Sequence, residues 1–380
     1  MNNFAGDKEL SVILPCRNES QAIAFCIKEI LAVFAEKKIN GEVIVSDSSQ
    51  DGSADIAQSL GAGVIRHNKL GYGNAILEGL KACRGEYIFI ADADGTYDFK
   101  EISNFLETLK QGNDMVIGNR LAGKMEKGAM PRLHRFFGNP ALSFLLRLFF
   151  KAKIRDAHSG MRAIRKEAIN QLGLRTTGME FASEMIIKAV KNKLKIKELP
   201  INYYNRKGDS KLRTWADGWR HLRFMLLYSP LFLFFIPGAT LFLVGLVLTA
   251  LLYFDIVAVF GLRLFYHPMF LTISLIIVGY QLIIFSVFAK TYAITHLGEE
   301  SKPMNYIHHY VTIEKAILAG LIFGGIGVFI YLYIFIKWLS SGFQALEEIE
   351  NSLIALALII FGIQTVFSSF MLSILGIKER

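Results

Sequence analysis

The stretch YIFIADADGTYDF, residues 87–99, places two carboxylates directly behind a short apolar run. The run YIFIA is typical of a buried strand. Asp92 and Asp94 are two positions apart, so both carboxylates can face one cation as the chain turns. Carboxylate oxygens are the ligands that Mg²⁺ and Mn²⁺ prefer. The stretch therefore predicts a strand followed by a metal-binding turn; the alternative is a pair of aspartates that cap a helix near 99–110.

Similar apolar runs lie on both sides of this strand and alternate with amphipathic segments. They are LSVILP (10–15), EVIVSD (42–47), GVIRH (63–67), DMVIGN (114–119), RAIRK (162–166) and KIKELPINYYN (195–205). Strands that alternate with helices are typical of βαβ units. We therefore predict an α/β fold with a mainly parallel sheet in the first half of the chain.

Polar residues follow several of these strands where each strand ends. They are Pro15, Asn18, Glu19, Asp47, Asp51, Asp92, Asp94, Asn119 and Arg120. Gly71-Tyr72-Gly73-Asn74, before a predicted helix, has the form of a phosphate-approach loop. Ligands of parallel sheets bind beyond the carboxyl ends of the strands. The sequence thus predicts a ligand site at this edge.

The second half of the chain is apolar. Hydrophobic residues make up 52% of the 380, and 30 are phenylalanines. Runs near 231–254, 268–290, 313–336 and 352–376 each exceed the roughly 20 residues that a membrane-spanning helix needs. We predict three parts: a catalytic domain over 1–212, a juxtamembrane amphipathic helix over 213–229 and a four-helix transmembrane domain over 230–380.

Charge indicates how these helices are oriented. Lys290, Lys302 and Lys315 flank the second inter-helix loop, the C-terminus is Lys378-Glu379-Arg380, and the third loop is acidic around Glu347–Glu350. By the positive-inside rule, the catalytic domain and the C-terminus are expected in the cytosol. The first residues lack the pattern of a secretory signal. Three cysteines without metal-site spacing fit a reducing compartment.

The net charge of +9 is concentrated before the first membrane helix, where eleven Lys or Arg and three Asp or Glu lie between Lys188 and Arg223. Because this basic stretch adjoins a membrane anchor, lipid phosphates are favoured as its partner over nucleic acid. Trp215–Tyr228 is predicted to form an amphipathic helix on the membrane surface. Phe136–Phe150 fits a second such helix or a buried one equally well.

Taken in order, the motifs resemble those of family 2 glycosyltransferases with the GT-A fold. They are SVILPCRNES, VIVSDSSQDGS, NKLGYGNAILEGLKACRGEYIFIADADGTYDF and MVIGNR. HSGMRAIRKEAI, GMEFASEMIIKA and RKGDSKL are similar to later motifs of polyprenyl-phosphate glycosyltransferases, the group of dolichyl-phosphate mannose and glucose synthases. The resemblance covers residues 9–228.

The resemblance implies roles for particular residues. A nucleotide-sugar would be bound by Pro15, Asn18, Glu19, Asp47, Asp51, Asn74, Asp92 and Ser159. Asp94, with Asp92 close by, would bind Mg²⁺ or Mn²⁺. Asp92, Asp94, Arg120 and Arg135 would be catalytic, and Arg135, Asn139, Arg206 and Lys211 would meet the acceptor phosphate.

Two positions depart from the family pattern. Ser46-Asp47 stands where a double Asp is common, so base recognition rests on one carboxylate. Thr96 stands where some relatives have a Gln, which leaves the third protein ligand of the metal open.

The expected activity is transfer of one hexose, with inversion, from UDP-glucose or GDP-mannose to a polyprenyl phosphate. The alternatives are a processive polysaccharide synthase and an inactive membrane adaptor. No Q-x-x-R-W motif for holding a growing polymer is found, and WADGWRHL (215–222) does not match it.

Overall fold

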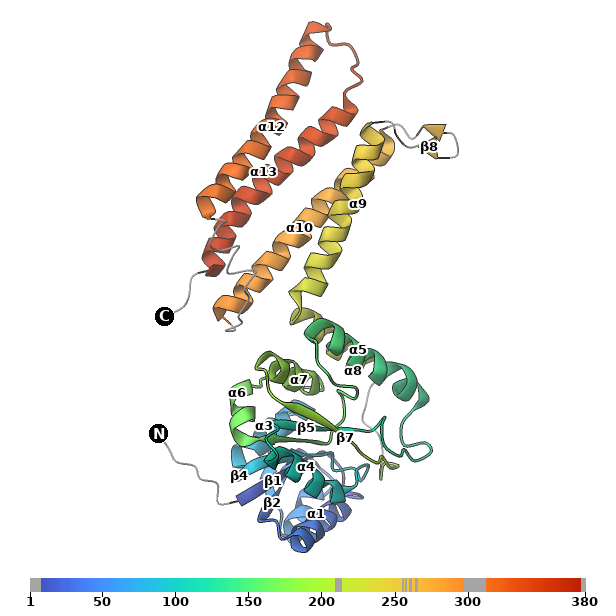
Figure 1. Ribbon diagram of the computed structural model, residues 1–380, viewed down its shortest axis with the longest axis vertical. Coiled ribbons are helices and arrows are strands. Elements are labelled where there is room, and N and C mark those ends of the chain that lie inside the picture. The colour runs from blue at the N-terminus through green and yellow to red at the C-terminus, as the bar shows by residue number, and fades with distance from the viewer. Residues whose placement is uncertain are drawn as a thin grey trace. The chain divides into compact units, whose positions relative to one another are not determined.

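The computed structural model describes residues 8–208, 214–254, 256, 258–259, 262–263, 266–296 and 312–376. The chain divides into two compact units, Met1–Tyr228 and Ser229–Arg380 (Figure 1). Helix α8, Thr214–Leu227, belongs to the first unit.

The first unit is built on a seven-stranded sheet in the order β3-β2-β1-β4-β6-β5-β7. Its strands are β1 Lys8–Cys16, β2 Gly41–Asp47, β3 Gly63–Arg66, β4 Gly85–Ile90, β5 Met115–Asn119, β6 Arg162–Arg165 and β7 Ile196–Pro200. Only β6 runs against its neighbours, β4 and β5. The predicted α/β fold with a mainly parallel sheet is confirmed, and each predicted strand is present with shifts at its ends.

Helices cover both faces of this sheet. One layer consists of α1 Ile23–Lys37, α2 Ser53–Ser59, η1 Phe99–Glu101 and α4 Ile102–Lys110; the other consists of α3 Tyr72–Ala82, α5 Asn139–Phe150, α6 Lys166–Leu172, α7 Phe181–Lys191 and α8. Alternate residues of β1 supply the two cores, because Val12 and Leu14 face the first layer and Ile13 faces the second. The loops at the strand ends are thus held on a rigid base.

Helix α5 is buried on one face only, within the segment Phe136–Phe150 that the sequence left open between a buried helix and a membrane-surface helix. Its Ser143 and Leu146 are fully buried against the unit, whereas Phe144 is 53% exposed. Phe136 and Phe137, in the preceding turn η2 (His134–Gly138), are 71% and 68% exposed. The segment is therefore anchored on one face and presents aromatic rings on the other. Contact with a membrane stays a prediction.

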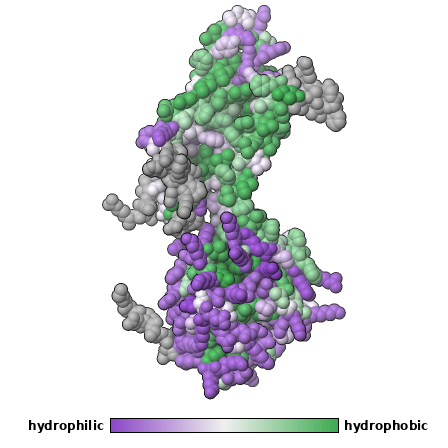
Figure 2. All heavy atoms as spheres, in the orientation of Figure 1, coloured by the Kyte–Doolittle hydropathy of each residue, from purple (hydrophilic) through white to green (hydrophobic). Residues whose placement is uncertain are grey.

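Four helices of the second unit are long and apolar enough to cross a membrane, among the residues that the structure describes. They are η3 Leu231–Phe235 continued by α9 Ile236–Tyr253, α10 His267–His296, α12 Ile313–Ser340 and α13 Ile349–Gly376; a short hairpin of β8 Ala258–Val259 and β9 Leu262–Arg263 follows α9. Figure 2 shows the predominance of apolar side chains in this unit. The chain is an integral membrane protein.

Glycines allow these helices to approach one another closely. A Cβ at Gly279 of α10 would lie 2.6 Å from the carbonyl oxygen of Gly238 on α9, and one at Gly362 of α13 would lie 2.6 Å from that of Gly320 on α12. Lipid chains are as apolar as the side chains, so such close backbone packing contributes much of the association between membrane helices. At the turn between α12 and α13, Lys337 Nζ bonds to Glu348 Oε1 at 2.5 Å.

The three cysteines of the first unit are predicted to resist alkylation in the folded protein. Cys16, Cys26 and Cys83 are each at most 6% exposed, and burial raises the pKa of each thiol to about 12. Since the thiolate is the reactive form, iodoacetamide at pH 8 should modify the native chain at least about 100-fold more slowly than the urea-unfolded chain. Mass spectrometry of the three peptides measures this; rapid labelling of the native chain would contradict the packing.

Candidate active site

The loops after β1 and β2 are tied together by the residues that the sequence singled out. The backbone N–H of Gln50 donates to Asn18 Oδ1 at 2.9 Å, and the N–H of Ser20 donates to Asp51 Oδ2 at 3.0 Å. Asn18 and Asp51 therefore shape the edge on which β1 and β2 end. Their contact with a donor stays a prediction.

Asp47 and Glu19 are the buried carboxylates of the same edge, 3% and 8% exposed. Asp47 accepts hydrogen bonds from the backbone N–H and hydroxyl of Ser49, at 3.1 and 2.5 Å. Glu19 accepts from the guanidinium of Arg206, which lies 187 residues later in the chain. Pro15, in β1, is paired in register with Ser46 of β2. The edge thus gathers carboxylates at the ends of neighbouring strands, as the spacing predicted.

Asp94 occupies the centre of the turn after β4. Its Oδ1 accepts from the backbone N–H and hydroxyl of Thr96, at 3.1 and 2.7 Å, and its Oδ2 lies 3.1 Å from Nη1 of Arg206. Gly95 follows with a φ of +76°, a conformation that disfavours other residues. Thr96, whose role the sequence left open, orients the Asp94 carboxylate.

Asp92 lies against the loop before β6. A Cβ added at Gly160 would be 2.2 Å from Asp92 Oδ2, so only glycine fits beside this carboxylate. The N–H of Gly160 donates to the hydroxyl of Tyr97 at 2.8 Å, which fixes the loop over the Asp92–Asp94 turn. The D-x-x-S-G pattern over 156–160 therefore forms the wall of the site.

The two carboxylates are close enough to affect each other. Burial raises the pKa of Asp92 to about 7, with a further contribution from the Asp94 carboxylate that Arg120, Arg206 and Arg162 oppose. A divalent cation would relieve this repulsion. No group of three or more His, Cys, Asp or Glu is arranged to hold a metal in the parts of the chain that the structure describes. The residues fit Mg²⁺ or Mn²⁺ held by two carboxylates, with a shell completed by water and phosphate oxygens.

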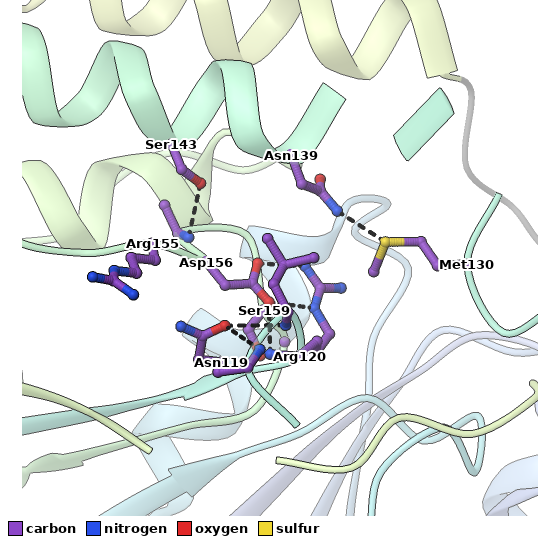
Figure 3. A network of polar contacts seen from close by, with 12 residues as sticks. Asn119, Arg120, Met130, Asn139, Ser143, Arg155, Asp156 and Ser159 are labelled. Carbon is purple, nitrogen blue, oxygen red and sulfur yellow. Dashed lines mark hydrogen bonds and ion pairs between the residues drawn. The ribbon is translucent and has the colours of Figure 1, made fainter. Parts of the chain in front are cut away.

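Arg120 is held by a buried carboxylate that the sequence did not indicate as its partner. Its Nε and Nη2 donate to the two oxygens of Asp156, both at 2.8 Å, and its backbone N–H donates to Asp156 Oδ2 at 3.0 Å (Figure 3). The guanidinium also lies 5.3 Å from the ring centroid of Tyr203. Asp156 thus joins the end of β5 to the wall of the site. The catalytic role of Arg120 stays a prediction.

Arg162 is a residue of the site that the sequence did not predict. It is 3% exposed, and it donates to the carbonyl oxygens of Ala157, Ser159 and Ala182 at 2.8, 2.8 and 2.9 Å. It therefore holds the 157–159 segment and the first turn of α7 together beneath Asp92. The available signal was an arginine at the first position of the predicted strand RAIRK.

Several predicted site residues have other contacts. Asn74 Nδ2 donates to the carbonyl of Leu70 at 2.9 Å, and Asn139 Nδ2 contacts Met130 Sδ at 3.4 Å. The guanidinium of Arg135 lies over the ring of Phe136, 5.3 Å from its centroid. Arg206, predicted for the acceptor phosphate, bridges Glu19 and Asp94. Lys211 lies outside the described residues.

Unpartnered polar atoms point to a polar ligand near the two carboxylates. Among the described residues, the buried side-chain atoms without a hydrogen-bond partner include Ser159 Oγ, His158 Nδ1 and Arg206 Nε. Ser159 is fully buried. Leaving such groups unpaired is costly, so partners are expected in the working enzyme.

Comparison with known proteins decides the family. The sequence model of "Glycosyl transferase family 2" matches residues 11–173, and that of "Glycosyltransferase family 2 C-terminal transmembrane region" matches residues 287–376. The low-salt glycan biosynthesis hexosyltransferase Agl6 of Haloferax volcanii is 39% identical over 97% of this chain and 89% of its own. The chain belongs to glycosyltransferase family 2.

A second relative of this glycosyltransferase is shorter. The dolichyl-phosphate hexose transferase of Haloferax volcanii is 33% identical over 55% of this chain and 89% of its own. Among solved structures, mannosyl-3-phosphoglycerate synthase from Rubrobacter xylanophilus is similar with a TM-score of 0.48 and 22% identity, over 57% of this chain and 73% of that one. The two family models and the match to Agl6 confirm the resemblance to family 2.

Proposed function

We propose that this glycosyltransferase moves a single hexose from a nucleotide-sugar of the UDP-glucose or GDP-mannose type to a polyprenyl phosphate. The observation that carries the proposal is the pair of the partly buried Asp92 and the buried Asp94. The pair lies beside unpartnered polar atoms, and the described part of the chain has four apolar helices. Relatives named as a hexosyltransferase and a dolichyl-phosphate hexose transferase support it.

The donor would lie across the carboxyl ends of β1, β2 and β4. Asp47 and Glu19, both buried at this edge, would accept hydrogen bonds from the nucleoside, and the unpartnered Ser159 Oγ would meet a sugar hydroxyl. A Mg²⁺ or Mn²⁺ held by Asp94 and Asp92 would neutralise charge on the diphosphate.

The acceptor would approach from the membrane. Helices α5 and α8 pack together within the first unit and expose large aromatic rings, including Trp215 at 83% and Trp219 at 58%. Aromatic rings with Arg220 and Arg223 on the same helix suit the interface between lipid and water. We place this surface, and with it the first unit and the C-terminus, at the cytosolic face.

The transfer needs no general base. A phosphate monoester is an anion near neutral pH, so its oxygen can attack the anomeric carbon directly. The bond between that carbon and the donor phosphate breaks, its electron pair passes to the leaving nucleoside diphosphate, and the configuration inverts. The work of the protein is to align both substrates and stabilise the leaving charge. Arg206 is placed to contribute, since its Nε has no partner within the described residues.

The proposal is tested with membranes that contain the chain and radiolabelled nucleotide-sugars, with and without added polyprenyl phosphate. We expect a labelled lipid that releases one hexose on mild acid hydrolysis and forms only with the lipid phosphate, and chelation by EDTA should abolish it. Long polymer would instead indicate a polysaccharide synthase. Absence of product across a panel of donors would instead indicate an inactive membrane adaptor.

A further inference from the structure

Three polar side chains, two of them buried and His158 partly buried, form a cluster next to the wall of the candidate site. His158 precedes Ser159, Ser183 lies on α7 and His221 lies on α8. Ser183 Oγ is 2.8 Å from Nδ1 of His221 and 3.2 Å from Nε2 of His158. The two imidazole rings meet edge to face, with centroids 4.3 Å apart. Ser183 is fully buried and His221 is 5% exposed.

The hydrogen bonds of this cluster depend on one another. The hydroxyl of Ser183 has one proton, so it donates to one imidazole while it accepts an N–H from the other. Both rings are held neutral: burial lowers the pKa of His221 to about 4 and that of His158 well below its usual range, and Arg162 lowers both further. Loss of either histidine therefore leaves the hydroxyl with half of its contacts.

The cluster adjoins the wall of the donor site. On either side of His158, the carbonyl groups of Ala157 and Ser159 are fixed by Arg162, and Gly160 rests against the Asp92 carboxylate. A displacement of His158 would move Ser159 Oγ and change the space available beside the Asp92 carboxylate. The ring of His158 is thus placed to set the position of this wall.

The other end of the cluster lies on the helix that precedes the first membrane span. Helix α8 exposes Trp215 and Trp219, whereas His221 and Met225, one turn apart, face the interior of the first unit. His221 gives α8 a directional polar contact there, while Met225 supplies apolar packing. Packing alone would tolerate a shift of the helix that a hydrogen bond of 2.8 Å would resist.

We propose that His221 is a positioning residue, which acts through Ser183 and His158 to hold the 156–160 loop against Asp92 and so couples the juxtamembrane helix to the placement of the donor sugar. The proposal rests on the proposed function in taking Ser159 and Asp92 as parts of a sugar site. The coupling between α8 and the loop itself stands on the contacts alone.

Two substitutions of His221 separate the hydrogen bond from the volume of the ring. Asparagine carries a polar atom at the place of Nδ1, whereas leucine has a similar size and no polar atom. We expect His221→Leu to lower kcat about tenfold, the factor that one hydrogen bond supplies, with the Kd of the nucleoside diphosphate within about twofold. His221→Asn should restore most of kcat. Ser183→Ala should lower kcat as much as His221→Leu does. The variant that carries both substitutions should have a kcat little below that of either single variant.

The matched control is Ala216→Ser, an exposed position of the same helix, which should leave kcat unchanged. A second measurement is amide hydrogen exchange of the peptide 156–161 in the full chain in detergent, which should rise in His221→Leu and not in His221→Asn. This readout needs no substrate, so it decides the coupling even where the transfer assay shows the proposed function to be wrong. The proposal would be overturned if His221→Leu kept the native hydrogen exchange of the peptide 156–161 and the native kcat. It would also be overturned if the leucine and asparagine variants lost kcat equally.

Discussion

Replacement of Asp94 by Asn is expected to lower hexose transfer by about 10²- to 10³-fold, the loss typical when a group that stabilises developing charge is removed. The amide keeps the shape of the carboxylate and an oxygen for the hydrogen bonds from Thr96. It removes the negative charge that would hold a divalent cation. Without the cation, the charge that develops on the leaving diphosphate is no longer stabilised. Initial rates with saturating donor, lipid phosphate and Mg²⁺ measure this loss, and Mn²⁺ binding by electron paramagnetic resonance should weaken in parallel.

Asp98→Asn is the matched control for this experiment. Asp98 lies on the same turn and caps η1, where its Oδ1 accepts from the N–H of Lys100 at 3.0 Å. Asparagine caps a helix nearly as well as aspartate, so transfer by this variant should stay within about twofold of the native rate. If Asp94→Asn retained full transfer with metal and donor unchanged, Asp94 could not be the metal ligand.

The fold could be predicted from the sequence because its signals are local. Most strands are short apolar runs, and the alternate side chains of β1 and β4 contribute to two cores. The antiparallel insertion of β6 between β4 and β5 was not predicted. Strand β6 has only the four residues RAIR, and nothing in them records the direction in which the strand enters the sheet.

The site could be predicted only in part, because its contacts join distant segments. Asp92 and Asp94 are recognisable together since only Ala93 separates them. The pairing of Arg120 with Asp156 spans 36 residues, and that of Glu19 with Arg206 spans 187. Sequence reasoning assigned Arg120 and Arg206 to phosphates, which stays a prediction, and it did not foresee their carboxylate partners.

Asp156→Asn is expected to destabilise the first unit by about 3–5 kcal/mol, because it leaves the Arg120 guanidinium buried without a counter-charge. The side chains of this pair are 8% and 0% exposed. The matched control is Asp55→Asn. The side chains of Asp55 and its partner Arg66 are 75% and 58% exposed, so this substitution should lower the free energy of unfolding by about 1 kcal/mol or less. Pulse proteolysis of the full chain in detergent across a urea gradient measures both free energies of unfolding. Equal, small losses in the two variants would show that the Arg120–Asp156 pair is not a buried structural contact.

Replacing both partners separates the structural role of Arg120 from a catalytic one. Apolar side chains of similar volume often substitute for a buried ion pair with little loss of stability, so Arg120→Met with Asp156→Leu should recover most of the free energy that Asp156→Asn loses. Transfer, however, should stay at least about 100-fold below the native rate if the guanidinium also stabilises phosphate charge, as we predict. Recovery of transfer together with stability would reduce Arg120 to a structural partner of Asp156. In that case, the predicted cations left for the leaving diphosphate, among those that the structure describes, would be Arg135 and Arg206, of which Arg206 already lies against Asp94.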